Sequence, residues 1–244
     1  MLKSLKDFIR QTFIALGIPV TRNIQYDILT KRILSRELQP NSNCVDVGAH
    51  KGEILDLFLE FAPQGKHTAF EPIPHLHKQL QLTHGTRVKV YPYALGSRTG
   101  SAIFNHVIDA PAYSGLQKRT YKQNNPQIEN IEVEVRMLDD VLSDSSNRID
   151  LIKIDVEGGE LDVLKGATAL LRRDNPLLVF EFGKGASEYY GTMPHHMLEL
   201  LESVGYSMWT LSGFWKRTSC ITADELKSIY TTGSDYYFVA APKK

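Results

Sequence analysis

The sequence predicts an α/β protein in which helices cover both faces of a mostly parallel sheet. Short β-branched or apolar runs alternate along the chain with segments of helical spacing, which is the order that builds such a sheet. The 244 residues are 42% hydrophobic and 23% charged, the balance of an ordinary globular chain. This length suits one large α/β core better than two small ones.

Seven runs are expected to form the strands: residues 43–48, 66–71, 88–95, 149–156, 177–182, 206–211 and 235–241. Between them, apolar residues recur at helical spacing in residues 54–61, 76–82, 160–172 and 194–204. Glycine or proline follows each of the first three runs and ends it. The last two runs are rich in aromatic residues, and we expect them to pair antiparallel at an edge of the sheet.

Residues 97–138 interrupt the alternation and are expected to form a hairpin insertion. Residues 101–108 and 131–137 alternate in polarity like strands with one exposed face. Residues 109–130 between them are polar and show no periodicity. Because loops of this length in compact domains usually bind ligands or cover a site, we expect a lid here.

Residues 1–42 are expected to be a helical segment that packs on a main domain spanning residues 43–244. Apolar residues recur at helical spacing in residues 2–16, and packing on the domain is favoured over attachment to a membrane surface. No stretch approaches the ~18 uncharged apolar residues of a membrane span, and no signal peptide is evident. The two cysteines lack ligand spacing. These features predict a cytoplasmic protein.

The charge balance favours a small-molecule or carbohydrate partner over nucleic acid. The 28 basic residues equal the 28 acidic ones, which leaves no broad basic field for a phosphate backbone. We expect no metal site, although Asp139, Asp155 and Glu157 have the oxygen ligands that Mg²⁺ prefers. The oligomeric state is not predicted.

The first strand delivers Asp46 into a glycine turn, Gly48-Ala-His50-Lys-Gly52, that opens a helix. Ligands of doubly wound sheets bind at such a turn. The spacing GxxxG differs from the GxGxxG of dinucleotide sites, and no phosphate-binding P-loop is present. With Asp46 on the strand, the turn suits a ligand that carries a cationic amine and no phosphate.

Glu71 ends the second strand, 25 residues after Asp46. An acid at about this distance binds the ribose hydroxyls of an adenosine-containing cofactor. Glu71 alone does not separate NAD from S-adenosylmethionine, but the glycine spacing does. The alternative is a solvated acid that caps the next turn.

Three ionisable residues, Lys153, Asp155 and Glu157, alternate within residues 151–160 and would share one buried face if the strand continued through them. Buried charges are costly unless they are paired. These side chains therefore either neutralise one another or meet a ligand.

Five motifs in order resemble the FkbM-like family of S-adenosylmethionine-dependent methyltransferases. They are Val45-Asp-Val-Gly-Ala-x-x-Gly52, Phe70-Glu-Pro72, Ala94-Leu-Gly96, Leu138-Asp-Asp140 and Ile152-Lys-Ile-Asp-Val-Glu-Gly158. The resemblance covers roughly residues 43–182. One departure is His50, where the family usually has Asn.

The resemblance implies a class I methyltransferase fold, Rossmann-like, with seven strands in a three-layer αβα arrangement. It implies S-adenosylmethionine as cofactor and O-methylation of a hydroxyl on a sugar, glycan or secondary metabolite. Asp46, Gly48, His50 and Gly52 would then shape the methionine side of the pocket. Glu71, with Pro72 beside it, would hold the ribose.

An alcohol is a poor nucleophile at neutral pH and needs a base to remove its proton. The resemblance places Asp155 and Glu157 near the methyl group and the acceptor, so we expect one of them to be this base, with Glu181 as a partner. Two other functions stay open: an NAD-dependent oxidoreductase or epimerase, and a catalytically silent binding domain of the same fold.

Overall fold

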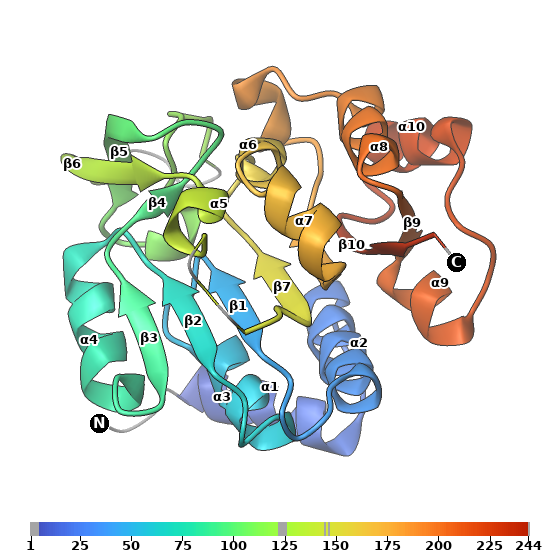
Figure 1. Ribbon diagram of the computed structural model, residues 1–244, viewed down its shortest axis with the longest axis horizontal. Helices are drawn as coiled ribbons and strands as arrows, with labels where there is room; N and C mark the ends of the chain where they lie inside the picture. Colours follow the sequence, from blue (N-terminus) through green and yellow to red (C-terminus); the bar gives the residue numbers. More distant parts are fainter. Residues whose placement is uncertain (1–4, 122–125, 144, 146, 244) are drawn as a thin grey trace.

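A seven-stranded sheet forms the centre of the computed structural model, which describes residues 5–121, 126–143, 145 and 147–243 (Figure 1). The strands are β1 (Cys44–Val47), β2 (His67–Phe70), β3 (Val88–Tyr91), β7 (Leu151–Ile154), β8 (Leu177–Glu181), β9 (Tyr206–Thr210) and β10 (Tyr237–Pro242). Their order in the sheet is β3-β2-β1-β7-β8-β10-β9, and only β10 runs antiparallel to its neighbours. The predicted fold class is confirmed, including the antiparallel pair at the edge.

Helices cover both faces of this sheet, which makes three layers. One face carries α2 (Arg22–Glu37), α3 (Glu53–Phe61), α4 (Pro74–His84) and α9 (Leu211–Lys216). The other carries α5 (Leu138–Val141), α6 (Glu160–Lys165), α7 (Thr168–Asp174), α8 (Pro194–Ser203) and α10 (Ala223–Thr232). Each face buries its own apolar core against the strands.

The two faces of the central strands follow the alternation of the sequence. Val45 and Ile152 belong to one core, whereas Cys44 and Leu151 belong to the other. Asp46 lies on the second of these faces, and the parallel register of β1 with β7 places it beside Lys153. Two charged residues therefore meet in the middle of a buried sheet.

The run predicted as one strand over residues 88–95 is two strands in different sheets. β3 ends at Tyr91, before Pro92, which has no N–H for a sheet ladder. β4 (Ala94–Leu95) instead joins β5 (Gly100–Val107) and β6 (Ile128–Arg136) in a three-stranded sheet. The long antiparallel pairing of β5 with β6 confirms the predicted hairpin insertion.

The helix predicted over residues 160–172 is also divided, into α6 and α7, with a break at Gly166 and Ala167. An added Cβ at Gly166 would lie 2.1 Å from the carbonyl oxygen of Gly96, so the two backbones are in contact here. The strand predicted to reach residue 156 ends at Ile154. Helices α9 and α10 were not predicted.

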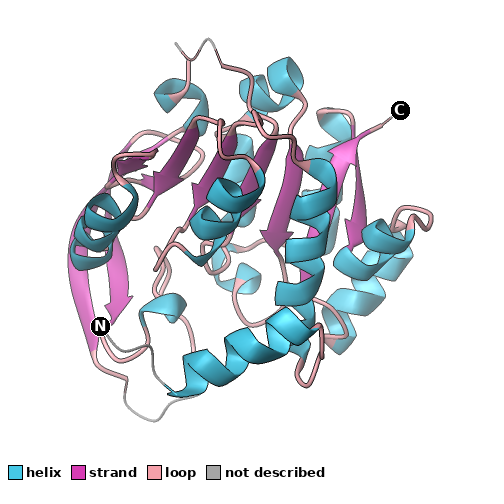
Figure 2. Cartoon of the chain, turned by 90° about the horizontal axis from the view of Figure 1, so that it is seen from below, coloured by secondary structure: helices cyan, strands magenta, loops and turns pink. Residues whose placement is uncertain are grey.

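Two helices, α1 and α2, precede the sheet within residues 1–42. In Figure 2 the helix that follows the N-terminus, α1 (Leu5–Leu16), lies across the lower edge of the view. Arg10 on α1 forms ion pairs with Asp27 on α2, at 3.0 Å, and with Glu53 on α3, at 2.8 Å. The division of the chain at residue 42 stays a prediction. Within the described ranges, every helix is too short or too polar to cross a bilayer.

Candidate functional site

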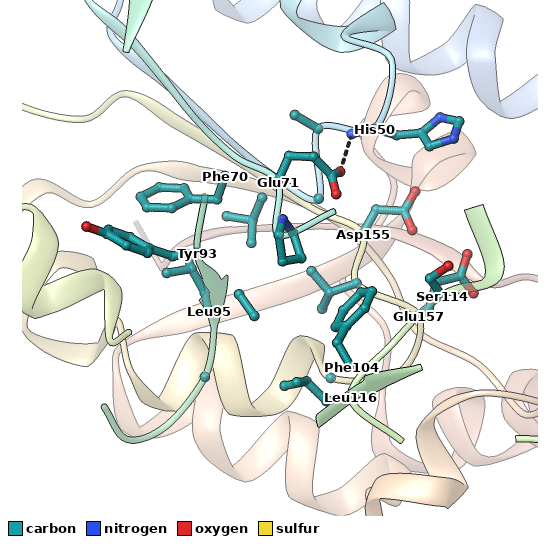
Figure 3. A pocket seen from close by; sticks show the side chains of 18 of the residues that line it. His50, Phe70, Glu71, Tyr93, Leu95, Phe104, Ser114, Leu116, Asp155 and Glu157 are labelled. Atoms are coloured by element: carbon teal, nitrogen blue, oxygen red, sulfur yellow. Dashed lines mark hydrogen bonds between the residues drawn. The ribbon is translucent and has the colours of Figure 1, made fainter. Parts of the chain in front are cut away.

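A cavity of about 430 Å³ opens where β1, β2 and β7 end, next to the insertion. This is the place where ligands of open α/β sheets bind. Figure 3 shows that two kinds of side chain line this cavity. Apolar side chains such as Phe70, Tyr93 and Phe104 line one part, and carboxylates line another. An apolar lining with a few polar groups is typical of a site for an organic ligand.

The glycine turn after β1 brings the backbone of two strands into contact at this cavity. Gly48 has a positive φ of 77°, and an added Cβ would lie 2.0 Å from the carbonyl oxygen of Asp155. Gly48 and Asp155 both line the cavity. Glycine at position 48 is therefore required by the packing of β1 against the segment after β7.

The close approach at Gly48 predicts a large loss of stability for Gly48→Ala. The positive φ alone costs about 1–2 kcal/mol for a residue with a Cβ, and the clash adds to this cost. Gly205→Ala is the matched control, because Gly205 has a φ of 83° and an added Cβ would meet open space. In thermal unfolding, Gly48→Ala should lower Tm at least twice as much as Gly205→Ala. Equal decreases would contradict the close approach.

Glu71 lies at the end of β2 and is 4% exposed. Its two carboxylate oxygens accept hydrogen bonds from the backbone N–H of His50, at 2.8 Å, and of Ile73, at 2.9 Å. Figure 3 shows the first of these bonds. Burial raises the pKa of Glu71 to about 7, although both amides lower it. Glu71 caps the next turn, as one interpretation proposed, but it is buried and lines the cavity.

Lys153 links the first strand to the carboxylates of the site. Its ammonium lies 3.1 Å from Asp46 and 4.0 Å from Asp155, and it donates a hydrogen bond to the carbonyl oxygen of Gly48. Burial lowers the pKa of Lys153, but the two carboxylates outweigh it and the net shift is upward. Asp46 is fully buried and does not line the cavity, whereas Lys153 does.

Asp155 and Glu157 both line the cavity but face different neighbours. Asp155 accepts a hydrogen bond of 2.7 Å from the hydroxyl of Tyr237 on β10. Glu157 lies beyond the end of β7, with a φ of 60°, and pairs with Arg119 of the insertion. In Figure 3, Asp155 lies nearer Glu71 and His50, and Glu157 lies nearer Ser114 of the insertion. The shared strand face predicted for Glu157 is wrong, because the strand has already ended.

Asp155 and Glu157 form the acidic wall of the cavity. Burial raises the pKa of three glutamates at or near this wall. The neighbouring Asp155 adds to the effect of burial at Glu157, whose pKa is about 8 even though Arg119 lowers it. Glu160 is fully buried, accepts hydrogen bonds from two backbone amides and has a pKa of about 7. The pKa of Glu181 is raised well above its usual value by burial and by Asp155 and Glu157. Glu181 does not line the cavity.

These upward shifts predict a free protein that loses stability as pH rises. Glu160 keeps its proton in the folded state up to about pH 7, whereas the unfolded chain loses it near pH 4.5. The stabilising contribution is therefore complete below pH 4.5 and disappears as pH rises towards 7. Glu160→Gln keeps an acceptor for both amides and cannot ionise. The difference in Tm between Glu160→Gln and the wild type should be more favourable to the variant at pH 8 than at pH 4; an equal difference at both values would contradict the assignment.

The remaining residues predicted for the pocket divide into two groups. His50 and Pro72 line the cavity. Burial and then Lys51 lower the pKa of His50, and its Nε2 finds no hydrogen-bond partner among the described residues. Gly52 instead lies at the start of α3, where an added Cβ would meet Leu80 and His84. Gly52 thus serves packing between α3 and α4.

Several cavity residues were not predicted from the sequence. Arg10 and Asp27 come from the two N-terminal helices, Tyr237 from the last strand, and Ser114 and Gln117 from the insertion. None of them belongs to a motif near the glycine turn. The expected lid over residues 109–130 was a signal for Ser114 and Gln117, and adjacent tyrosines at residues 189–190 were another, since Tyr190 lines the cavity.

The segment predicted as a lid is shorter and more structured than expected. β6 begins at Ile128, and η1 (Pro111–Tyr113) lies within the segment. Asp139 accepts hydrogen bonds from the amides of Ala169 and Leu170, so it caps α7. Residues 122–125 of the segment lie outside the described residues. Closure over an acceptor stays a prediction.

A family model described as the methyltransferase FkbM domain matches residues 46–208. Methyltransferase 1 of Beauveria bassiana is 29% identical over 145 residues, which cover 52% of this chain and 58% of that protein. The 2-O-methyltransferase NoeI of Sinorhizobium fredii is 26% identical over 187 residues, covering 71% of this chain and 76% of that protein. The chain thus spans less than two thirds of the Beauveria protein.

The fold is similar to a solved structure of methyltransferase FkbM from Methylobacillus flagellatus. The two share 18% sequence identity with a TM-score of 0.50, over 83% of this chain and 44% of the other. At this identity the similarity concerns the fold.

Proposed function

The chain belongs to the FkbM family of S-adenosylmethionine-dependent methyltransferases, and from this premise we propose that it methylates a hydroxyl group of a sugar, glycan or secondary metabolite. The observation that carries the proposal is Glu157, a cavity-lining carboxylate whose pKa of about 8 suits a general base near neutral pH. The printed name of NoeI, a 2-O-methyltransferase, agrees with this chemistry.

The residues at the glycine turn fit S-adenosylmethionine. Each oxygen of Glu71 accepts one backbone hydrogen bond and keeps a second lone pair, so the carboxylate has acceptors left for two ribose hydroxyls. The unpartnered Nε2 of His50 is a further polar contact. Gly48 presents bare backbone, and Pro72 lies beside Glu71 at the cavity. When bound, S-adenosylmethionine supplies a methyl group on a positively charged sulfur.

Asp155 is assigned to the donor side of the cavity and Glu157 to the acceptor side. Asp155 is held by Tyr237 and lies beside Lys153, next to the glycine turn. In this proposal Asp46 acts indirectly, because it holds the ammonium of Lys153 and has no surface in the cavity. The carboxylate of Glu157 takes the hydroxyl proton of the acceptor as the new oxygen–methyl bond forms.

Glu181 is proposed as a partner of Glu157. Burial raises the pKa of Glu181, and the negative charges of Asp155 and Glu157 raise it further, so the two glutamates lie close enough to interact. Ser114, Gln117 and Tyr190 line the cavity on the side of the insertion and offer hydroxyl and amide groups to a polar acceptor. A neutral, hydroxyl-rich acceptor fits this wall, since a second anion would meet Glu157 and Asp155.

The alternative of an NAD-dependent oxidoreductase loses its support, because the FkbM family model covers the glycine turn and the carboxylates on which that alternative rested.

An activity assay tests the other alternative, a catalytically silent domain. We expect incubation with labelled S-adenosylmethionine and a panel of glycans and metabolites to yield a product heavier by one methyl group on oxygen. Calorimetry should show binding of S-adenosylhomocysteine and not of NADH. Transfer to nitrogen or carbon alone would overturn the proposal.

A further inference from the structure

The insertion reaches into the acidic wall of the cavity through one side chain. Arg119 lies in the segment between η1 and β6, and its guanidinium contacts the carboxylate of Glu157. The side chains of Arg119 and Glu157 are 9% and 16% exposed, so the pair is largely shielded from water. The guanidinium also lies 5.3 Å from the ring centre of Tyr113, at the end of η1. Arg119 itself does not line the cavity, whereas Glu157 does.

The surroundings of Glu157 are otherwise acidic. Asp155 lies two residues before it in the chain, Glu160 begins α6, and Glu181 ends β8; Asp155 and Glu160 both raise the pKa of Glu157. Tyr190 from η2 (Ser187–Tyr190) and Tyr237 from β10 also line this part of the cavity. Lys153 forms an ion pair with Asp46 and donates a hydrogen bond to the carbonyl oxygen of Gly48. Arg119 is therefore the cation that the fold pairs with Glu157.

Hydrogen bonds hold the segment that carries Arg119 on both sides of it. The backbones of Asn105 and Gly115 exchange hydrogen bonds of 2.9 and 3.2 Å. The hydroxyl of Tyr190 accepts a hydrogen bond from the amide of Gln117, at 3.2 Å. The hydroxyl of Tyr189 accepts one from the amide of Thr120, at 3.1 Å, and donates one to its side-chain oxygen, at 2.8 Å. The position of Arg119 is thus fixed by the insertion and η2 together.

We propose that Arg119 is a positioning residue for the reaction: it orients the carboxylate of Glu157 and keeps it able to accept a proton, which makes the insertion part of the catalytic unit. The inference rests on the proposed function, in which Glu157 is the base. An ionised carboxylate that is largely shielded from water and surrounded by three other acids needs a counter-charge. Without Arg119, Glu157 would be protonated more easily, because protonation removes its repulsion with the neighbouring acids. A protonated carboxyl group cannot accept the proton of the acceptor hydroxyl.

The first test needs no acceptor. Glu157 of the free protein is titrated by carbon NMR of its carboxyl group, whose signal is assigned by its loss in Glu157→Gln. Arg119→Gln should move the midpoint upward by at least about one pH unit, and Arg119→Lys should move it less. Lys31→Gln removes a charge from an exposed ion pair with Glu60 and should leave the midpoint unchanged. An unchanged midpoint in Arg119→Gln would overturn the inference.

The second test measures kcat and KM against pH with the acceptor found by the labelled assay. Arg119→Gln should shift the acidic limb of kcat upward by the same amount, with the affinity for S-adenosylhomocysteine within about threefold, and Arg119→Lys should restore part of the rate. An unshifted limb would contradict the inference. If no hydroxyl is methylated at all, the proposed function fails, while the NMR titration still decides whether Arg119 sets the ionisation of Glu157.

Tyr189→Phe provides a variant that keeps every charge. It removes the hydroxyl that binds Thr120, and Tyr189 lies at the surface, so folding is not at risk. We expect a smaller shift of the Glu157 midpoint in the same direction, because Arg119 is held less firmly. A shift in the opposite direction would contradict the role of the insertion.

Discussion

Replacing Glu157 with Gln is expected to lower kcat by about 10²- to 10⁴-fold, the range that a general base contributes. Glutamine has the same shape and still offers an acceptor to Arg119, so the wall of the cavity is kept. It cannot take a proton from the acceptor hydroxyl. Because Glu157 lies on the side of the insertion, the affinity for S-adenosylhomocysteine should stay within about threefold of the wild type.

The measurement pairs methyl-transfer kinetics with calorimetry of S-adenosylhomocysteine on the same preparations. Asp56→Asn is the control, since Asp56 is an exposed acid that contacts His84 away from the cavity. Asp155→Ala is also expected to lose turnover, with a larger effect on cofactor binding because of its place beside the glycine turn. Full activity in Glu157→Gln would show that Glu157 is not the general base. Full activity in both variants would favour a domain without catalytic function.

Glu71→Ala is expected to weaken the binding of S-adenosylhomocysteine by about 100-fold or more. Hydrogen bonds to a charged group contribute about 1.5–3 kcal/mol each, and the carboxylate of Glu71 is assigned two of them to the ribose. The turnover number at saturating cofactor should fall far less, because Glu71 does not reach the transferred methyl group in this assignment. The expected signature is therefore a large change in Kd and KM with a small change in kcat.

Glu71 also holds the amides of His50 and Ile73, so the variant must be shown to fold. Circular dichroism and thermal unfolding serve this purpose. Glu60→Gln is a control, because Glu60 lies on the exposed face of α3 and pairs with Lys31. A folded Glu71→Ala protein with an unchanged Kd for S-adenosylhomocysteine would refute the assignment of Glu71 to the ribose.

Much of the fold could be predicted because its signals are local. The alternation that places Val45 and Ile152 on one core is a property of each strand alone. The glycine turn after Asp46 and the proline after Glu71 mark where two strands end, and the structure places both ends at the cavity. The hairpin of the insertion was visible for the same reason. Where prediction failed, at Pro92 and Gly166, a single backbone feature ended an apolar pattern that looked continuous.

The candidate site was predicted only in part. Glu71, Asp155 and Glu157 could be named because carboxyl ends of parallel strands meet at one edge of the sheet. The motif that contains Asp46 gave no sign that this residue lies beneath the cavity, since the register of β1 with β7 decides it. Nothing near Arg119 in the sequence marks it as the partner of Glu157, 38 residues away along the chain.

The sequence by itself determined the αβα class, most of the strands along the chain and the carboxylates at their ends, because periodicity and turn residues act over a few neighbouring positions. The tertiary structure alone decided which of these carboxylates face the cavity, which cations neutralise them, and that Tyr237 contacts Asp155 and Arg119 contacts Glu157. The physical reason is that burial and charge pairing depend on distances between residues far apart in the chain, and a local pattern carries no information about those distances.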